Sequence, residues 1–543
     1  MLNLLNNVTD CYPTTPPSTY LIARQCLAGL GRFIFRADNS KIASKGQWPR
    51  SEQLPMNGRR AYKSDVSFLE KISLGAVGTR KVFQNIAAQG HHPIELERGS
   101  MSFKIWKRIK IKRVRVPDIL CIQCGKRVES RAKTNLEITM SHSASTAERG
   151  WDFGLEEDDH IALVKCIRSG EKPIDWVAEE PVQYVKVGNM REAYGKGLAF
   201  AEKPKGAGEG FEIRVTWPSS LARDDGEVIS VDSKRIQYRN SRSGRVVTLG
   251  LSKRGVLLEP RVRVGEAVRK NQIIASVVPV VQRFDCDKMA SAEHYLSMLD
   301  SASLSDRYVS AKALAHFPSD NVADALTRVV RNDREHIYVR LEAASSLLRL
   351  GQTEYLSFFT GLLNDPYLEN RLECVIVLGE IDLDESCNLL ITTLLDSGQH
   401  PEIRAGAAWS LGELRNQKAT EALIRVFNEV GAAVREEAAR ALMKFADSYS
   451  EDIIHLFPKS TEEERAGIAW ALSKSGQFEL TDLIRSMTDD EARKWIAWII
   501  GTQDKAKYIN QIEHLKHTDG EVYFAVTVLW KILSSWIAEL DIY

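Results

Sequence analysis

Residues 340–351 read RLEAASSLLRLG, and residues 404–412 read RAGAAWSLG. Both stretches begin with an arginine, continue with small residues and close with a Leu-Gly pair. Small residues let two helices approach closely, leucines at helical spacing fill the seam between them, and a glycine after the last apolar position ends a helix. The pattern therefore predicts helical hairpins that stack on one another.

The arginine of this pattern recurs through the second half of the chain at separations of 28 to 33 residues. Its copies are Arg307, Arg340, Arg371, Arg404, Arg435, Arg465 and Arg493. One hairpin cannot bury its own apolar face, so several hairpins have to stack into a solenoid. We expect the repeated arginine to contact an adjacent loop or helix end rather than a ligand. The units resemble the HEAT-like repeats of phycobilisome lyases and bacterial scaffold proteins, and this resemblance implies a surface that binds or braces something large.

The rest of the chain has to supply further domains, because 543 residues are too many for one core. An apolar content of 44% with 27% charged residues is typical of a soluble globular protein. No run of 18 or more apolar residues occurs, which argues against a transmembrane helix. Eight scattered cysteines without a framework pattern favour a cytoplasmic location over a secreted scaffold.

The first residues differ in composition from all that follow. Residues 1–63 mix Pro, Ser and Asn with one short apolar patch, which predicts a poorly ordered leader. A mitochondrial presequence is an alternative, because acidic residues are sparse there. Patterned sequence begins at Ser64, so Met56 is also a candidate natural start.

A helical segment from Ser64 to a glycine stop at Gly90 leads into a strand-like stretch that contains Pro117-Asp118. Glu129 follows eleven residues later, at a distance typical of a hairpin. Here the chain resembles the PD-(D/E)XK nuclease superfamily, in which an acid after Pro and a Glu-x-Lys motif lie on neighbouring strands. The resemblance implies that Asp118 and Glu129 bind Mg²⁺ or Mn²⁺ and that Glu70, on the preceding helix, supplies an additional acid.

One position departs from the nuclease motif. The lysine expected two residues after Glu129 is Arg131, and arginine does not readily release a proton. Residues 129, 131 and 133 share one face of a strand, so Lys133 is the candidate catalytic lysine. The catalytic set that the resemblance implies is therefore Glu70, Asp118, Glu129 and Lys133, and an inactive, binding-only descendant stays open as the alternative.

The surroundings of these acids favour nucleic acid. From Arg98 to Lys133 there are twelve Lys or Arg residues and only two acids, Asp118 and Glu129. Such a field attracts a phosphate backbone, so DNA is the expected ligand. The predicted nucleic-acid-binding residues are Lys104, Lys107, Arg108, Lys110, Lys112, Arg113 and Arg131. A solvated basic hairpin is the alternative.

Cys121-x-x-Cys124-Gly is similar to half of a zinc knuckle. Cys166, His142 or His160 would have to supply the remaining ligands for Zn²⁺. A plain turn and a redox pair are the two other interpretations. His142 is also a candidate to line the nuclease cleft, although a structural role in a loop is the favoured interpretation.

Between the nuclease-like block and the repeats the sequence is strand-like, with short alternating runs and frequent Gly. Residues 225–239 and 262–275 resemble the barrel-sandwich hybrid segments of the bacterial RNA polymerase β subunit. A similar Val-x-x-Gly-Glu pattern occurs in lipoyl and biotinyl carriers, but the modifiable hairpin-tip lysine of those carriers is missing. We expect a small β-rich module that spaces the nuclease-like block from the repeats.

The sequence thus predicts a multidomain α+β protein in four parts. They are a leader at 1–63, an α/β nuclease-like domain at 64–172, a β-rich barrel-like module at 173–283 and an all-α HEAT-like solenoid at 284–543. The favoured function is that of a Mg²⁺-dependent DNA endonuclease of a bacterial restriction, phage-defence or repair system, with no membrane partner. The alternative is a non-catalytic scaffold that grips nucleic acid or binds a protein partner through its solenoid.

Overall fold

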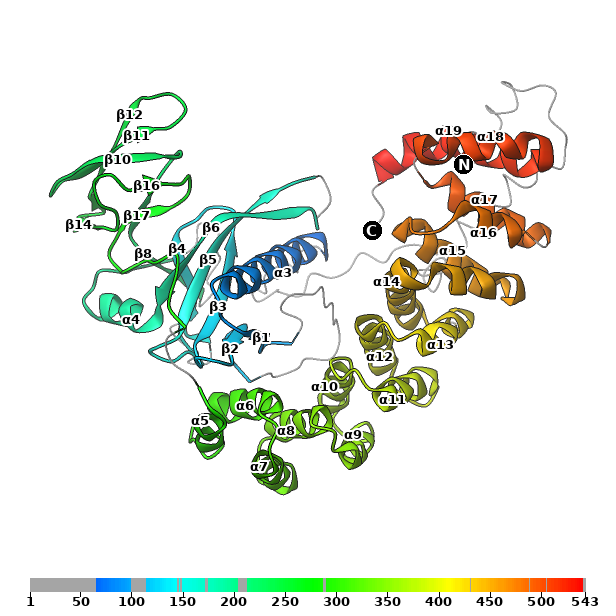
Figure 1. The fold of residues 1–543 in the computed structure, drawn as a ribbon, viewed down its shortest axis with the longest axis horizontal. Helices are drawn as coiled ribbons and strands as arrows, with labels where there is room; N and C mark the ends of the chain where they lie inside the picture. The colour runs from blue at the N-terminus through cyan, green and yellow to red at the C-terminus, as the bar shows by residue number, and fades with distance from the viewer. Residues whose placement is uncertain are drawn as a thin grey trace, which may run out of the picture. The chain divides into compact units, whose positions relative to one another are not determined.

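The computed structural model describes most of the chain from residue 65 to residue 540. Outside the described residues lie 1–64, 99–113, 144–145, 147–148, 171–173, 204–211, 287–289, 430, 488, 504 and 541–543, and no side chain of 531–540 is described. The described chain forms two compact units, the first ending at Gln352 and the second starting at Thr353 (Figure 1). The predicted leader, including Met56, lies outside the described residues.

The first unit is built on a five-stranded sheet with the order β1-β2-β3-β5-β6. Its strands are β1 (Pro93–Glu95), β2 (Ile119–Cys121), β3 (Arg127–Lys133), β5 (His160–Arg168) and β6 (Trp176–Lys186). The neighbours β3 and β5 are parallel, whereas every other pair is antiparallel. The buried strands are rich in Val, Ile and Leu, as a sheet covered on both faces requires.

Helix α3 (Asp65–Ala88) lies across one face of this sheet (Figure 1). Its residues Val82 and Ile86 are buried against strand residues that include Val128 and Val164. At Gly78 the helix approaches β3 so closely that an added Cβ would overlap the side chain of Ala132. Glycine is thus required at residue 78 by the helix–sheet spacing.

Gly78→Leu should lower the free energy of unfolding by about 1–3 kcal/mol, because the larger side chain forces α3 away from the sheet. Gly75→Leu is the matched control, since nothing lies within 4 Å of a Cβ built at Gly75 on the same helix. Urea denaturation followed by circular dichroism measures both variants. Equal stability of the two variants would contradict this packing of α3 on β3.

The opposite face of the sheet is covered by a three-stranded sheet and by α4 (Val187–Gly195). The strand order is β4-β8-β7, with β4 (Ile138–Ser143), β8 (Glu212–Trp217) and β7 (Phe200–Glu202). Trp151 and Trp217 lie edge to face at 4.9 Å in this second core, and Trp217 donates its indole N–H to the Met190 carbonyl at 3.0 Å.

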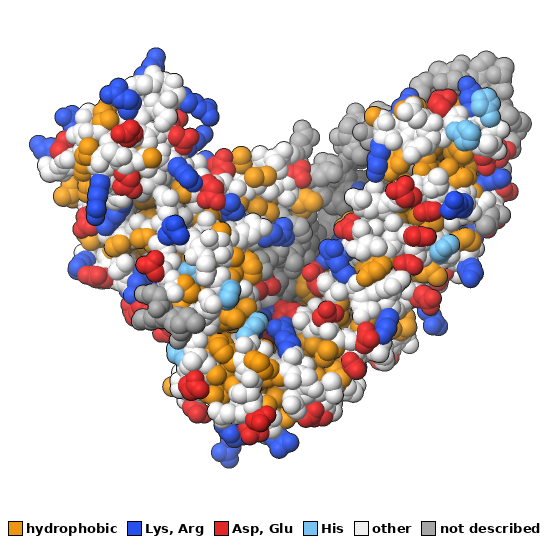
Figure 2. All heavy atoms as spheres, in the orientation of Figure 1, with side chains coloured by type: hydrophobic (Ala, Val, Ile, Leu, Met, Phe, Trp, Pro, Cys, Tyr) orange, Lys and Arg blue, Asp and Glu red, His pale blue; other side chains and the backbone are white. Residues whose placement is uncertain are grey.

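A β-rich module follows, made of several small sheets around its own core, as predicted. Its strands are β9 (Ser219–Leu221), β10 (Gly226–Val231), β11 (Arg235–Asn240), β12 (Val246–Gly250), β13 (Ser252–Lys253), β14 (Val256–Leu257), β15 (Glu259–Pro260), β16 (Ala267–Val268) and β17 (Ile273–Ser276). Figure 2 shows Lys and Arg side chains over the exposed β11–β12 hairpin, where Arg242 and Arg245 lie.

After β17 the chain returns to the edge of the five-stranded sheet. Tyr184 in β6 donates its backbone N–H to the Val281 carbonyl at 2.7 Å and accepts the Val281 N–H at 3.0 Å. Gln89, just past α3, donates to the Gln282 carbonyl at 3.2 Å. Residues 281–286 are called the return segment, and they precede the first repeat helices.

The first repeats belong to the same unit as the sheet. They contain α5 (Ala292–Met298), α6 (Leu304–Ala313), α7 (Asp320–Arg331) and α8 (Ile337–Arg349). Arg127 of β3 forms two bonds with Asp159, at 2.7 and 2.8 Å, and also reaches Asp306 of α6 at 3.2 Å. Arg98 forms a buried ion pair with Glu342 of α8. Two buried arginines therefore tie the sheet to the first two hairpins.

The second unit is all-helical, as the repeat pattern predicts. Its helices are α9 (Leu356–Leu362), α10 (Leu368–Leu378), α11 (Asp384–Leu395), α12 (Pro401–Leu414), α13 (Thr420–Arg425), α14 (Ala432–Leu456), α15 (Glu462–Ser475), α16 (Leu480–Arg485), α17 (Asp490–Gly501), α18 (Lys505–Thr518) and α19 (Gly520–Leu540). Glycines permit close packing of successive helices, since a Cβ on Gly412 of α12 would overlap Ala441 of α14. No helix in the described part of the chain has the length and apolarity needed to cross a membrane.

The repeated arginine makes the structural contact that its position predicts. Arg340 donates to the Val330 carbonyl at 2.9 Å, Arg404 to the Leu394 carbonyl at 2.8 Å, and Arg465 to the Phe457 carbonyl at 3.0 Å. Each acceptor lies at or just beyond the end of the preceding helix. The same guanidinium groups reach Asp333, Glu429 and Asp489 respectively. Each arginine thus closes one helix end and pairs with a neighbouring loop acid.

The structure differs from the predicted boundary between residues 172 and 173. That boundary falls inside the β5–β6 hairpin, whose strands pair from His160↔Lys186 to Arg168↔Trp176. The predicted boundary at 284 also separates the first repeats from the unit that they join. Both differences arise because strand pairing and buried ion pairs connect segments that composition alone separates.

Candidate metal centre

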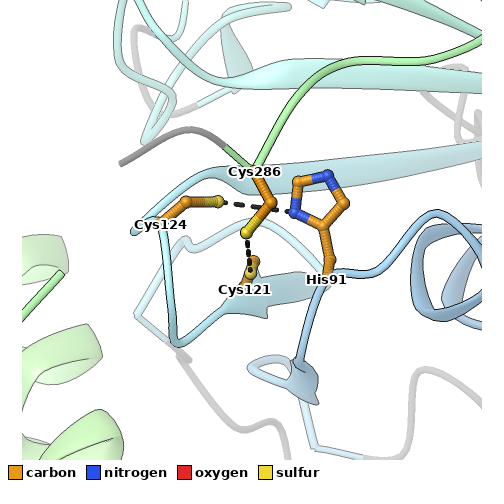
Figure 3. Close-up of side chains that lie close together, drawn as sticks. All are labelled: His91, Cys121, Cys124 and Cys286. Carbon is orange, nitrogen blue, oxygen red and sulfur yellow. Dashed lines mark hydrogen bonds between the residues drawn. The ribbon is translucent and has the colours of Figure 1, made fainter. Parts of the chain in front are cut away.

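Three cysteines and a histidine meet at one edge of the five-stranded sheet (Figure 3). The ligand atoms of His91, Cys121, Cys124 and Cys286 all lie within 4.8 Å of one another. Within the described residues, this is the one group of three or more His, Cys, Asp or Glu side chains arranged to hold a metal ion. The first three side chains are buried, and Cys286 is half-buried.

His91 reaches the site because α3 ends immediately before it. Gly90 adopts φ of +91°, and the His91 backbone N–H donates to the Ile86 carbonyl at 3.3 Å. This is the glycine stop predicted at residue 90, and it closes the helix with a left-handed residue. The imidazole then turns inward from a short, fixed connection.

Cys121 and Cys124 lie on a tight turn between β2 and β3, here called the knuckle (residues 121–126). Cys121 exchanges backbone hydrogen bonds with Lys126 and Gly125, both at 2.9 Å. Gly125 adopts φ of +70°, a value that favours glycine. The knuckle thereby directs both thiols to the same side.

Cys286 arrives on the return segment from a position 165 residues beyond Cys121. The Lys126 ammonium donates to the Asp285 carbonyl, and Tyr295 of α5 donates its hydroxyl to the Ile122 carbonyl at 3.0 Å. The return segment is thus attached to the knuckle on both sides of Cys286.

Two close contacts define the cluster. Cys124 Sγ lies 3.4 Å from His91 Nδ1, and Cys121 Sγ lies 3.9 Å from Cys286 Sγ. The hydrogen bond from the Cys124 thiol lowers the pKa of Cys121 to about 4, despite burial, and the same bond raises the pKa of Cys124. The site therefore favours a thiolate at Cys121.

The residues predicted to complete a zinc knuckle lie elsewhere. Cys166 is buried in the core beneath α3, and His160 stacks on Phe284 with ring centroids 4.7 Å apart. His142 accepts the Trp151 backbone N–H through Nδ1 at 3.3 Å. None of the three contributes a ligand to the cluster, and His91 and Cys286 stand in their place. Sequence reasoning missed these two, although His91 directly follows the helix stop.

The structure brings Asp118 and Glu129 together. The β2–β3 register continues from Ile119↔Val128, so Asp118 faces Glu129 across the hairpin. The Ser130 N–H donates to Asp118 Oδ2 at 2.7 Å, and Arg131 pairs with Glu129 at 2.7 Å. Arg131 is thus engaged by the neighbouring acid, and the predicted nucleic-acid residues at 104–113 lie outside the described residues.

Glu70 and Lys133 are not part of that arrangement. Glu70 pairs with Arg168 at the far end of β5, seven residues beyond the partner of Glu129, a distance of roughly 23 Å along the strand. Lys133 donates to the Glu137 and Thr139 carbonyls, both at 2.6 Å. Burial lowers the pKa of Lys133 to about 7. The four predicted catalytic residues do not converge on one metal sphere.

Asp118→Asn should stabilise the protein at neutral pH. Burial raises the pKa of Asp118 well above its ordinary value of 3.8, and the charges of Glu129 and Glu97 raise it further. The unfolded chain releases this proton near 3.8 whereas the folded chain retains it, so the stability of wild type falls as pH rises above that value. Asparagine stays neutral, and its amide oxygen still accepts the Ser130 N–H.

We expect the variant to be more stable than wild type by about 1 kcal/mol or more at pH 7.5, the order of the penalty for burying a poorly compensated polar group. The difference should shrink as the pH approaches 4. Urea denaturation of both proteins between about pH 4 and 8 tests this expectation. Removal of bound ions should change the stability of wild type and of the variant by the same amount. A variant less stable at neutral pH would mean that Asp118 is an ionised carboxylate held by a cation.

Comparison with known proteins identifies the repeats. Residues 358–443 and 388–473 match the model of HEAT repeats. No curated protein matches the chain. Among solved structures, the CpcE–CpcF complex of phycocyanin lyase from Nostoc sp. PCC7120 shares 17% identity over 46% of this chain and 99% of that chain, with a TM-score of 0.24.

Two further structures have a similar likeness. Human deoxyhypusine hydroxylase in complex with glycerol shares 18% identity over 39% of this chain and 83% of its own, with a TM-score of 0.18. An engineered protein shares 18% identity over 47% of this chain and 85% of its own, with a TM-score of 0.23. Neither likeness carries an inference about activity.

Proposed function

We propose that this chain is a scaffold that holds a protein partner along its HEAT repeats in the cytoplasm. The observation that carries the proposal is the run of helical hairpins in which the repeat arginines Arg340, Arg404 and Arg465 each join one helix end to a neighbouring loop. Such a run presents an extended and rigid surface rather than an enclosed pocket, which suits a large ligand. The described cysteines are free thiols, as a reducing compartment requires.

Three arginine-bearing helices of the second unit, α12, α14 and α15, offer a surface suited to this role. The fifth residue after the repeat arginine is Trp409 in α12, Arg440 in α14 and Trp470 in α15, and all three are partly or fully exposed. The Lys444 ammonium lies 5.9 Å from the Trp409 ring. Tryptophan and arginine carry most of the binding energy at protein interfaces. We call these residues, Trp409, Arg440, Lys444 and Trp470, the aromatic–basic column.

A tagged full-length chain, used to enrich proteins from its own source, tests this role. The wild type should recover a partner that the Trp409→Ala/Trp470→Ala variant recovers at least about tenfold less, since an interface tryptophan contributes about 2 kcal/mol or more. Quantitative mass spectrometry measures the recovery, and reconstitution of the purified pair then gives the two dissociation constants.

Tyr367→Ala is the matched control, because Tyr367 is a more exposed aromatic (62%) that precedes α10 and lies outside the aromatic–basic column. This variant should recover the partner like wild type. If all three proteins recover the same partner equally, binding occurs elsewhere. If the purified repeats bind no protein, the scaffold proposal fails.

Phosphodiester hydrolysis remains a separate prediction with one supporting observation, the proximity of Asp118 and Glu129. A pair of buried acids can bind Mg²⁺ or Mn²⁺, and DNA would be the substrate expected from the basic segment. The test is nicking of plasmid, linear and single-stranded DNA with either ion, comparing wild type with Asp118→Ala. Equal activity in both proteins would assign the cleavage to another site or a contaminant, and none in either would leave the scaffold role alone.

A further inference from the structure

The cluster described above has the dimensions of a tetrahedral metal site. With Zn–S bonds of about 2.3 Å and a Zn–N bond of about 2.0–2.1 Å, tetrahedral geometry separates two sulfurs by about 3.8 Å and a sulfur from a nitrogen by about 3.6 Å. The observed separations are 3.9 Å for Cys121 Sγ to Cys286 Sγ and 3.4 Å for Cys124 Sγ to His91 Nδ1. Both match edges of the same tetrahedron.

The histidine is held in the form that such a site needs. His91 Nε2 lies 3.0 Å from the Phe284 carbonyl, an acceptor, so Nε2 carries the proton. Nδ1 is then the nitrogen with a free lone pair, and it faces the sulfurs. A backbone carbonyl that fixes the second ring nitrogen is the usual partner of a metal-binding histidine.

We propose that His91, Cys121, Cys124 and Cys286 bind one Zn²⁺ and thereby fasten the knuckle to the segment that enters the first helical repeat. Three thiolates with one imidazole form a soft donor set that selects zinc over the hard ions Mg²⁺ and Mn²⁺. Binding replaces the thiol protons, which pass to the buffer. All four ligands come from the protein, so the site is closed and structural rather than catalytic.

The four ligands come from three segments that are far apart in the sequence. His91 follows α3, the two knuckle cysteines join β2 to β3, and Cys286 lies six residues before α5 begins. The knuckle also contacts α5 beside the site, where the Tyr295 hydroxyl donates to the Ile122 carbonyl. An ion at this point would hold the start of the repeats against the sheet, independently of any partner of the second unit.

Metal analysis of the purified full-length chain tests the site. We expect about one zinc per chain in wild type and at least about tenfold less in Cys286→Ala, because a structural site loses its affinity with a ligand. Cys166→Ala is the control, a buried cysteine of the same unit outside the cluster, and it should retain zinc. Cobalt-substituted wild type should show a thiolate charge-transfer band and the intense visible bands of a tetrahedral ion. Cys286→Ala treated in the same way should show neither.

A second variant covers misfolding of Cys286→Ala. His91→Cys keeps four soft ligands and should keep zinc, whereas His91→Ala should lose it. Hydrogen exchange in the knuckle and in residues 290–299 should speed up when a chelator removes the ion from wild type. The proposal is overturned if wild type contains no metal, contains iron in place of zinc, or has a Cys121–Cys286 disulfide. It is also overturned if Cys286→Ala contains as much zinc as wild type. Zinc loss without faster exchange would refute its fastening role.

Discussion

Leu411→Asp should unfold the second unit at a much lower temperature than wild type. We expect its free energy of unfolding to fall by roughly 4 kcal/mol or more. Leu411 is fully buried on α12, which packs between α10 and α14. The substitution removes an apolar side chain from the seam and places a carboxylate there without a partner. Thermal unfolding followed by circular dichroism measures the change.

Leu395→Asp is its control, because it makes the same chemical change at a residue of α11 that is 36% exposed. Surface changes of this kind alter stability by about 0.5 kcal/mol or less. A midpoint for Leu411→Asp close to that of Leu395→Asp would mean that the seam between α10, α12 and α14 is packed differently from the structure described.

Glu342→Leu destabilises the first unit by about 3–5 kcal/mol, the cost of removing one member of a buried ion pair. Arg98 and Glu342 are 2% and 1% exposed, and Arg98 Nη2 donates to Glu342 Oε2 at 2.6 Å. Arg98 Nη1 also donates to the Tyr308 hydroxyl at 3.1 Å. Chemical denaturation monitored by tryptophan fluorescence, to which both units contribute, measures the loss.

The double variant Arg98→Met/Glu342→Leu should recover most of that loss, because apolar residues of similar volume replace a buried pair at little cost. The exposed pair Lys418–Asp384 supplies a comparison, and Lys418→Ala should leave stability unchanged within error. A double variant as unstable as Glu342→Leu would show that the arginine acts through packing and not through its charge.

The repeats could be predicted from the sequence because their determinants are local. A helix, its glycine stop and the position of an arginine are set within about ten residues, and the packing repeats with the sequence. The contacts of Arg340, Arg404 and Arg465 with preceding helix ends confirm the expected structural role of the arginine. The same reasoning correctly placed the end of α3 at Gly90.

The N-terminal sheet shows where local reasoning stops. Pairing of β3 with β5, and of β6 with the return segment, is set by side chains far apart in the sequence. The adjacency of Asp118 and Glu129 was accessible because one hairpin contains both. Glu70 was misplaced because α3 runs for 24 residues, or about 36 Å, and Glu70 lies near the end remote from the knuckle.

Only two of the four ligands of the metal cluster could be predicted from the sequence, because only those two are close together in it. The two knuckle cysteines share one turn, so their spacing predicts a half-site. His91 and Cys286 join them only through the end of α3 and through the return of the chain after the β-rich module. Which cysteine or histidine completes a half-site depends on this topology, and spacing in the sequence carries no information about it.

The return segment has a consequence for the order in which the protein matures during synthesis. Val281 is 97 positions after Tyr184, so at about 5–20 residues per second it is made roughly 5–19 s later. During that interval the N–H and C=O of Tyr184 lack their partner on Val281, and the edge of β6 stays open. A nascent chain stalled before residue 281 would therefore expose a strand edge that the finished protein covers, and would be the form most prone to aggregate.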